Sequence, residues 1–206
     1  MMDRTRALAT FLAVIGWPAL ITQLFASIAY QQQQGHSVAY GIFMYAGYFT
    51  ILTNLFCTIV ATAYVKNHAA ESRWNIWREP WVVTAATMAI AMVGLVFHLL
   101  LRKQYQPTGI AALTNLIHHY IVPLVFLVFW WFTVPRRSVA WGDISRLFAY
   151  PAAYFVYIAA RGEISGVYPY PFFDVSTIGY GQAALNAAGI AVVFILAGMG
   201  LIAAKR

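Results

Sequence analysis

Residues 114–134 read TNLIHHYIVPLVFLVFWWFTV, an apolar run that also carries Asn115, His118 and His119. A helix of about 20 apolar residues is long enough to cross the hydrocarbon core of a bilayer. Ionisable groups at that depth are costly, so they usually face the inside of a helix bundle and often mark a functional site. The stretch therefore predicts a membrane-spanning helix with His118 at the centre of a candidate site.

The composition of the whole chain also indicates an integral membrane protein. Of its 206 residues, 62% are hydrophobic and only 9% are charged, whereas a soluble domain has about 25% charged residues. The net charge is +7, but the basic residues lie at the ends of apolar runs. That distribution is typical of membrane topology and argues against nucleic-acid binding. The single cysteine, Cys57, leaves no disulfide framework and no Cys-based metal site.

Six apolar runs predict an all-α bundle of six transmembrane helices in one domain, residues 1–206. The runs cover approximately residues 7–30, 38–65, 81–101, 110–134, 147–160 and 182–204. Six spans put both termini on one side of the membrane, and ten of the thirteen Lys and Arg residues then share that side, leaving only Arg102, Lys103 and Arg161 opposite. The positive-inside rule places that side, with both termini, in the cytoplasm.

With this topology, the polar residues of the second to sixth helices gather in the outer half of the bilayer. His118 lies roughly 12 Å and Thr50 roughly 18 Å along their helices from the outer surface. The residues near the outer helix ends are His98, Tyr157, Arg161, Glu163 and Asn186. We expect them to form one polar pocket that opens toward the outer face or the outer leaflet.

Helical spacing selects between the two histidines of the opening stretch. Thr114 and Asn115 lie four and three residues before His118, so a regular helix puts all three on one face. His119 points about 100° away from that face. Asn115 or Thr114 is then expected to orient the His118 ring.

A threonine hydroxyl beside a neutral imidazole is the minimum for nucleophilic acyl transfer, and Thr50 with His118 is the best pair in the chain. No G-x-S-x-G elbow and no H-E-x-x-H motif appears, and acidic clusters suited to a metal are missing. Spacing alone equally allows structural roles, because a threonine in a membrane helix commonly bonds a carbonyl of its own or a neighbouring helix.

Two other classes of function fit the same residues. The pocket would serve a non-enzymatic protein that binds or transports a lipid or another small molecule. Alternatively, His98, His118 and His119 would hold haem or a metal, although adjacent residues of a regular helix cannot both face one iron.

Three short motifs resemble one family, the androgen-induced-gene and androgen-dependent TFPI-regulating membrane proteins. They are Tyr48-Phe49-Thr50 with Asn54, then Asn115 with His118 five residues before Pro123, and Tyr168-Pro169-Tyr170-Pro171-Phe172 before the last helix. The family's members are threonine hydrolases of fatty acid esters of hydroxy fatty acids with six predicted spans. The chain resembles a bacterial-type branch, which implies a multi-pass protein of the bacterial inner membrane.

The resemblance implies roles for individual residues. Thr50 would be the nucleophile and His118 the general base, with Thr53 and His119 as the alternatives in a neighbouring register. The substrate would be a lipid with an ester bond, and no cofactor is implied. The reaction itself also needs a donor to the oxyanion, and the sequence leaves Asn54, Asn115 and Tyr157 as alternatives for it. Arg161 would hold a free carboxylate of the substrate, and Asn186 is a further supporting or substrate-binding candidate.

Overall fold

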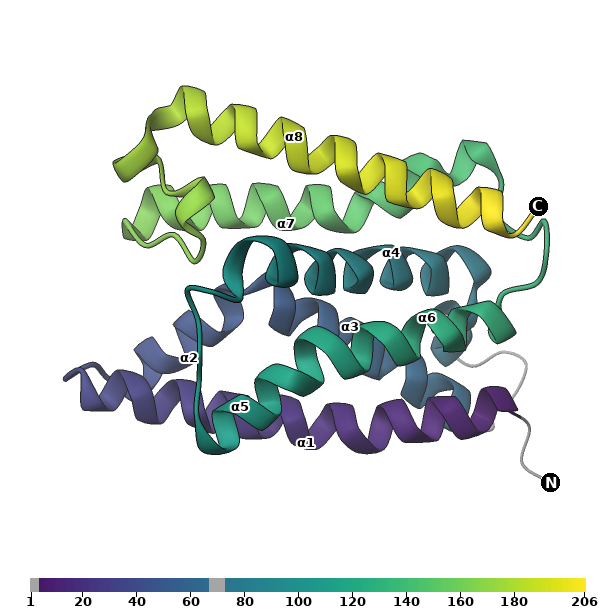
Figure 1. Ribbon diagram of the computed structural model, residues 1–206, viewed down its shortest axis with the longest axis horizontal. Helices are drawn as coiled ribbons and strands as arrows, with labels where there is room; N and C mark the ends of the chain where they lie inside the picture. The colour runs from purple at the N-terminus through teal and green to yellow at the C-terminus, as the bar shows by residue number, and fades with distance from the viewer. Residues whose placement is uncertain (1–3, 67–72) are drawn as a thin grey trace.

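A computed structural model describes residues 4–66 and 73–206, and helices without any strand make up the regular structure of this part of the chain (Figure 1). The α-helices are α1 (Arg4–Gln33), α2 (Val38–Gly47), α3 (Phe49–Val65), α4 (Pro80–Val96), α5 (Gly109–Leu116), α6 (Val122–Thr133), α7 (Ile144–Ser165) and α8 (Val175–Ala204). Two π-helical segments, η2 (Phe97–Leu101) and η3 (Ile117–Ile121), and three short 3₁₀ helices, η1 (Arg73–Arg78), η4 (Trp141–Asp143) and η5 (Pro171–Phe173), complete it. The predicted all-α class is confirmed.

Several helices are long and apolar enough to cross a membrane. They are α1, α4 with η2, the continuous α5–η3–α6 helix, and α8, and the bent pair α2–α3 brings the number to five. The predicted fifth run corresponds to α7, which has 22 residues but is not apolar enough to be counted with the others. A multi-pass membrane protein is therefore plausible, while the sixth span stays a prediction.

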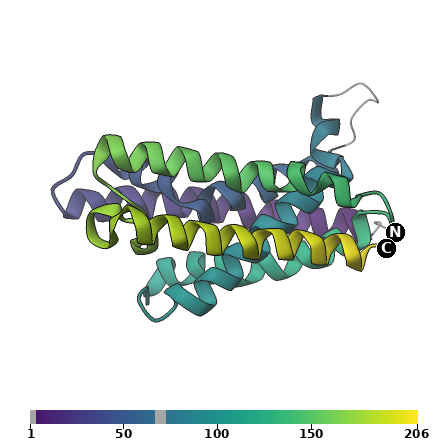
Figure 2. The ribbon, with the colours of Figure 1, turned by 90° about the horizontal axis from the view of Figure 1, so that it is seen from above.

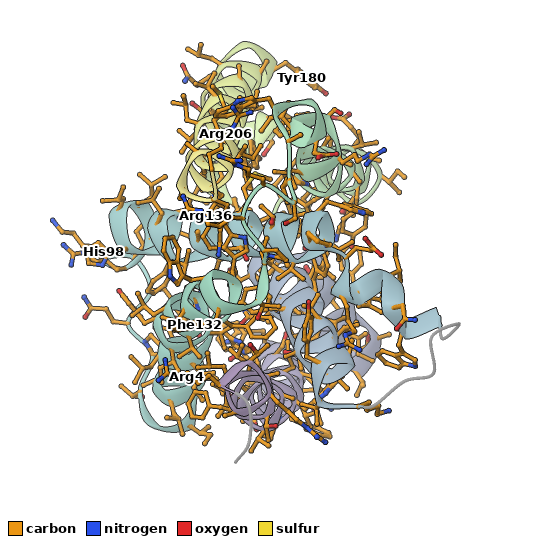
Figure 3. The ribbon with its side chains drawn as sticks, turned by 90° about the vertical axis from the view of Figure 1, so that its right-hand side faces the viewer. Arg4, His98, Phe132, Arg136, Tyr180 and Arg206 are labelled. Atoms are coloured by element: carbon orange, nitrogen blue, oxygen red, sulfur yellow. The ribbon has the colours of Figure 1, made fainter. Side chains whose placement is uncertain are left out.

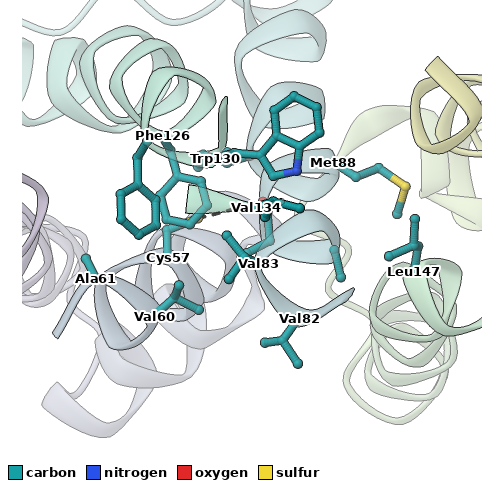
Figure 4. Packing of buried hydrophobic residues seen from close by; sticks show 14 of the residues in the cluster. Cys57, Val60, Ala61, Val82, Val83, Met88, Phe126, Trp130, Val134 and Leu147 are labelled. Atoms are coloured by element: carbon teal, nitrogen blue, oxygen red, sulfur yellow. Dashed lines mark hydrogen bonds between the residues drawn. The ribbon is translucent and has the colours of Figure 1, made fainter. Parts of the chain in front are cut away.

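Helix α4 is the centre of the bundle and contacts α3, α6, α7 and α8 (Figure 1). Phe126 and Trp130 of α6 share the main hydrophobic core with Cys57 of α3 (Figure 4). The Trp130 indole N–H donates to the hydroxyl of Thr84 in α4, 3.0 Å away. A buried donor without a partner costs about 1–3 kcal/mol, so Thr84 makes the burial of Trp130 possible.

The start of α1 and the end of α8 lie at the same end of the molecule (Figures 1 and 2). Figure 3 looks at that end and labels Arg4, Arg136 and Arg206, which belong to three different parts of the chain. Lys205 ties the C-terminal segment to α6, because its Nζ donates to the Trp131 carbonyl at 2.5 Å. Adjacent termini agree with an even number of crossings; which side of the membrane they occupy stays a prediction.

A sharp bend separates α2 from α3, although the sequence predicts one helix over residues 38–65. The two helices meet at 76°, and Tyr48 between them has an extended backbone. Three donors from one face of α7 bond carbonyl groups of the last turns of α2, and those of Ala46 and Gly47 have no backbone donor within the described chain. The hydrogen bonds run from Tyr154 Oη to the Gly47 carbonyl (2.8 Å), from Tyr157 Oη to that of Ala46 (3.3 Å) and from Arg161 Nη2 to that of Phe43 (3.1 Å).

Gly47 is expected to be required at this bend. A Cβ atom there would lie 2.5 Å from Nη1 of Arg161, whose guanidinium is held by the Phe43 carbonyl and ring. Gly47→Ala should therefore lower the free energy of unfolding by about 1–3 kcal/mol, as overpacking of a core does. Thermal unfolding of the purified protein in detergent measures the change.

Gly200→Ala is the matched control for Gly47→Ala. No atom lies within 4 Å of a Cβ built at Gly200 in α8, and alanine is favoured over glycine inside a helix by about 1 kcal/mol. Equal unfolding temperatures for Gly47→Ala and Gly200→Ala would show that the contact between Gly47 and Arg161 does not constrain the bend.

Candidate functional site

Thr50 is the second residue of α3, directly after the bend. The amides of Ile51 and Leu52 donate to the Tyr48 carbonyl, but those of Phe49 and Thr50 make no backbone hydrogen bond within the described chain. Free N–H groups and the helix dipole favour negative charge at the start of a helix. The Thr50 hydroxyl therefore lies where a developing anion is stabilised.

His119, not His118, lies beside the Thr50 hydroxyl. Thr50 Oγ1 and His119 Nε2 are 3.3 Å apart, and His119 Nδ1 lies 3.0 Å from the Asn115 carbonyl oxygen. Because a carbonyl only accepts, Nδ1 carries the proton and the Nε2 lone pair faces Thr50. Phe97 stacks on the imidazole, with ring centroids 3.8 Å apart. Hydroxyl, imidazole and orienting acceptor form the arrangement of an activated nucleophile.

A π-helical turn explains why the nearer histidine differs from the expected one. Both histidines lie in η3, where the wider turn shifts the angular positions that a regular α-helix would give. Phe97, the partner of His119, begins the other π segment, η2. Such segments frequently occur at functional sites, and here the two meet beside Thr50.

His118 is buried next to the same site, with 2% of its surface exposed. Neither ring nitrogen has a hydrogen-bond partner among the described residues. The backbone of Ala19 lies close to the ring, but outside hydrogen-bond geometry. Both histidines thus line the same cavity as Thr50, but only His119 is shown within hydrogen-bond distance of its hydroxyl.

Two cavities meet at Thr50. The first, the apolar cavity, has a volume of about 400 Å³ and includes Met92, Phe155 and Ile190 in its lining. The second, the polar cavity, has about 550 Å³ and is lined in part by Gln23, Tyr48, Tyr105, Asn115, His118 and His119. Thr50, Phe97, Leu101 and Tyr170 line both. A molecule that reaches Thr50 can therefore extend in two directions into surroundings of different polarity.

The predicted residues Asn54 and Asn115 occupy different places at the site. Asn54 is buried and lines neither cavity; its Nδ2 donates to the Thr50 carbonyl at 2.8 Å and the His118 carbonyl at 3.3 Å. It thereby joins the first turn of α3 to η3. Asn115 lines the polar cavity, where its Oδ1 is buried without a partner.

Tyr157, Arg161 and Asn186 line neither cavity. Tyr157 and Arg161 donate to the end of α2, and Arg161 is 6% exposed with its guanidinium 3.8 Å from the centre of the Phe43 ring. Asn186 Nδ2 donates to the Phe172 carbonyl at 2.9 Å. In this arrangement Tyr157 and Arg161 support the bend, and Asn186 supports the loop before α8.

Tyr170 is a site residue that sequence reasoning missed, although the Tyr-Pro-Tyr-Pro-Phe motif contains it. It is 8% exposed and lines both cavities. Burial raises the pKa of its phenol to about 12, and hydrogen bonding with the Thr50 side chain and with the amides of Thr50 and Phe49 opposes that rise. The Tyr170 hydroxyl therefore lies beside the amides of Phe49 and Thr50, which have no backbone acceptor, and keeps its proton at neutral pH.

No group of three or more His, Cys, Asp or Glu side chains within the described ranges is placed to hold a metal. His98, the third histidine considered for haem or a metal, is exposed, and its Nδ1 lies 3.4 Å from the Tyr120 hydroxyl. The chain was also compared with known proteins. No protein-family model, no curated protein and no solved structure matches it.

Proposed function

We propose that the protein is a membrane-embedded lipid-ester hydrolase in which Thr50 is the nucleophile and His119 the general base. The observation that carries the proposal is the chain of contacts from Thr50 Oγ1 to His119 Nε2 and from His119 Nδ1 to the Asn115 carbonyl. A weak nucleophile needs such a base, and the base needs a partner that fixes its tautomer. The position of Thr50 between two cavities supports a substrate with groups on both sides of its ester.

The reaction has two steps. The Thr50 oxygen attacks the ester carbonyl carbon while His119 Nε2 takes the hydroxyl proton; the tetrahedral intermediate then expels the alcohol, which receives that proton, and an acyl-threonine remains. Water, deprotonated by the same nitrogen, attacks the acyl-threonine; the second tetrahedral intermediate then releases the carboxylic acid and expels the Thr50 oxygen, which takes the proton back from His119 Nε2. His119 is thus base and acid in turn.

The amides of Phe49 and Thr50 are the best candidates for the oxyanion hole. They lie at the start of α3 and make no backbone hydrogen bond in the part of the chain that the structure describes. The nearby hydroxyl of Tyr170 adds a side-chain donor, since its raised pKa keeps it protonated. Loss of one such donor typically lowers kcat by about 10²–10³-fold.

The bilayer supplies the substrate in this proposal. The apolar cavity suits an acyl chain because Phe and aliphatic side chains dominate its lining. The motif resemblance to threonine hydrolases of fatty acid esters supports the same class of substrate. In full, the proposal includes six spans with α7 as the fifth, both termini in the cytoplasm, an inner membrane of bacterial type, and a site in the outer half of the bilayer.

Covalent labelling tests the proposed nucleophile. Purified protein in detergent is treated with an alkyl fluorophosphonate, and the modified residue is located by peptide mass spectrometry. We expect the adduct on Thr50, because base activation is local, and none on Thr53 or Thr58, whose hydroxyls bond Tyr150 and the Asn54 carbonyl. An adduct on another residue, or a protein that neither reacts nor hydrolyses lipid esters, would favour a binding or transport protein with the same pocket.

A further inference from the structure

The polar cavity contains buried hydrogen-bonding groups that the protein does not satisfy. His118 is 2% exposed, with neither ring nitrogen paired, and Asn115 Oδ1 is likewise buried and unpaired. Both residues line the cavity. Buried polar groups are nearly always hydrogen-bonded, and each one left without a partner costs about 1–3 kcal/mol. The reaction proposed above uses His119 and gives His118 no task.

The other polar groups of this cavity are uncharged, and several have partners within the protein. Gln23 Oε1 accepts from the Thr114 hydroxyl at 2.6 Å, and the Tyr45 hydroxyl donates to the Leu20 carbonyl at 2.8 Å. Among the described residues that line the cavity, none is Lys, Arg, Asp or Glu. Among the described residues of this lining, His118 and Asn115 are the ones with side-chain polar atoms that are both fully buried and without a hydrogen-bond partner.

The absence of charge in this lining selects the chemistry of the ligand. A buried carboxylate needs a cationic partner, since an isolated ion in an apolar interior costs several kcal/mol. Arg161, which the sequence suggests for that role, lies outside the cavity with its guanidinium engaged by α2. A hydroxyl needs no counter-charge, and it both donates and accepts, as a neutral imidazole also does.

We infer that the polar cavity binds the uncharged, hydroxyl-bearing alcohol half of a lipid ester, as in a monoacylglycerol, through His118 and Asn115. One alcohol hydroxyl donates to Asn115 Oδ1 or to the free nitrogen of His118, and the His118 N–H donates to a hydroxyl oxygen. The inference rests on the proposed hydrolase for the presence of an ester at Thr50. Recognition of the polyol, however, does not require hydrolysis.

Equilibrium binding of a non-hydrolysable ligand tests the inference separately from catalysis. Radiolabelled 1-O-hexadecylglycerol is bound to purified wild-type protein and displaced by hexadecyl methyl ether or by hexadecanoate, which share its chain. We expect both competitors to be at least about 10-fold weaker than unlabelled 1-O-hexadecylglycerol, since a site built for hydroxyls rejects analogues that lack them. Competition by hexadecanoate as strong as by the glycerol ether would overturn the choice of an uncharged ligand.

Variants assign the discrimination to His118. His118→Leu should lose at least about 10-fold in affinity for the glycerol ether and should no longer distinguish it from the methyl ether. His118→Gln, which keeps a donor and an acceptor, should recover part of the difference. His98→Leu changes an exposed histidine outside both cavities and should bind like wild type.

Full discrimination in His118→Leu, or none in wild type, would overturn the inference. Failure of the proposed function is measured by a different experiment, the fluorophosphonate labelling and the ester hydrolysis. A protein that fails both of these tests can still bind the glycerol ether selectively.

Discussion

Thr50→Ala is expected to lower kcat/KM for lipid-ester hydrolysis by at least about 10³-fold, because it removes the attacking oxygen. Thr50→Ser keeps that oxygen and should retain measurable turnover. Release of oleate from monooleoylglycerol by the purified protein measures both. The substitution should cost little stability, since the contact of the Thr50 hydroxyl with His119 Nε2 is long, at 3.3 Å, and Tyr170 keeps its contacts with the amides of Phe49 and Thr50.

Thr53→Ala is the matched control one turn along α3. Thr53 is fully buried, its hydroxyl lies 3.0 Å from the Tyr150 hydroxyl, and it lines neither cavity. Its loss should reduce thermal stability while hydrolysis per folded molecule stays near wild type. If Thr50→Ala and Thr50→Ser bound lipid and behaved alike, with wild-type turnover in both, Thr50 would be a recognition residue without a covalent role.

The class of the fold is readable from the sequence because hydropathy is a local property. The apolar runs around residues 7–30, 81–101 and 110–134 match α1, α4 with η2, and α5–η3–α6. The bend at Tyr48 is not readable in this way. It depends on Tyr154, Tyr157 and Arg161, which lie more than 100 residues further along and donate to carbonyl groups in the last turns of α2.

The same long-range contacts explain why the roles of Arg161 and Tyr157 differ from expectation. A buried arginine near the outer end of a helix predicts an anion site from its charge alone. Its guanidinium instead donates to a backbone carbonyl and lies over the Phe43 ring. The charge of Arg161 can be read from the sequence, whereas its acceptor, the Phe43 carbonyl, is identified only once α2 and α7 are packed together.

The spacing of residues in the sequence could not select between His118 and His119, and the reason lies in the local helix geometry. A period of 3.6 residues puts His118 on the face of Thr114 and Asn115. The chain instead forms η3, whose wider turn leaves the His118 carbonyl to Asn54 and turns the His119 ring toward Thr50. Sequence reasoning therefore pointed to the stretch that the structure places beside Thr50, and it named His119 as an alternative without a means to prefer it.

The contrast between the two histidines gives a second large expected effect. His119→Gln should lower kcat by about 10³-fold or more on any ester, because glutamine cannot take a proton from Thr50. His118→Gln should instead affect chiefly the affinity for hydroxyl-bearing substrates. Steady-state hydrolysis of ethyl oleate and of monooleoylglycerol by both variants separates an effect on kcat from an effect on KM.

His98→Gln is the matched control for His119→Gln. It makes the same change in the other π segment, at an exposed ring that contacts Tyr120 and lines neither cavity, so kcat should stay within about twofold, as for most surface substitutions. Loss of fluorophosphonate labelling in His119→Gln, but not in His98→Gln, would show that the variant has lost the activation of the Thr50 hydroxyl. If His118→Gln abolished turnover of ethyl oleate while His119→Gln preserved it, the general base would be His118, and the π-helical register would not be the one in which the protein reacts.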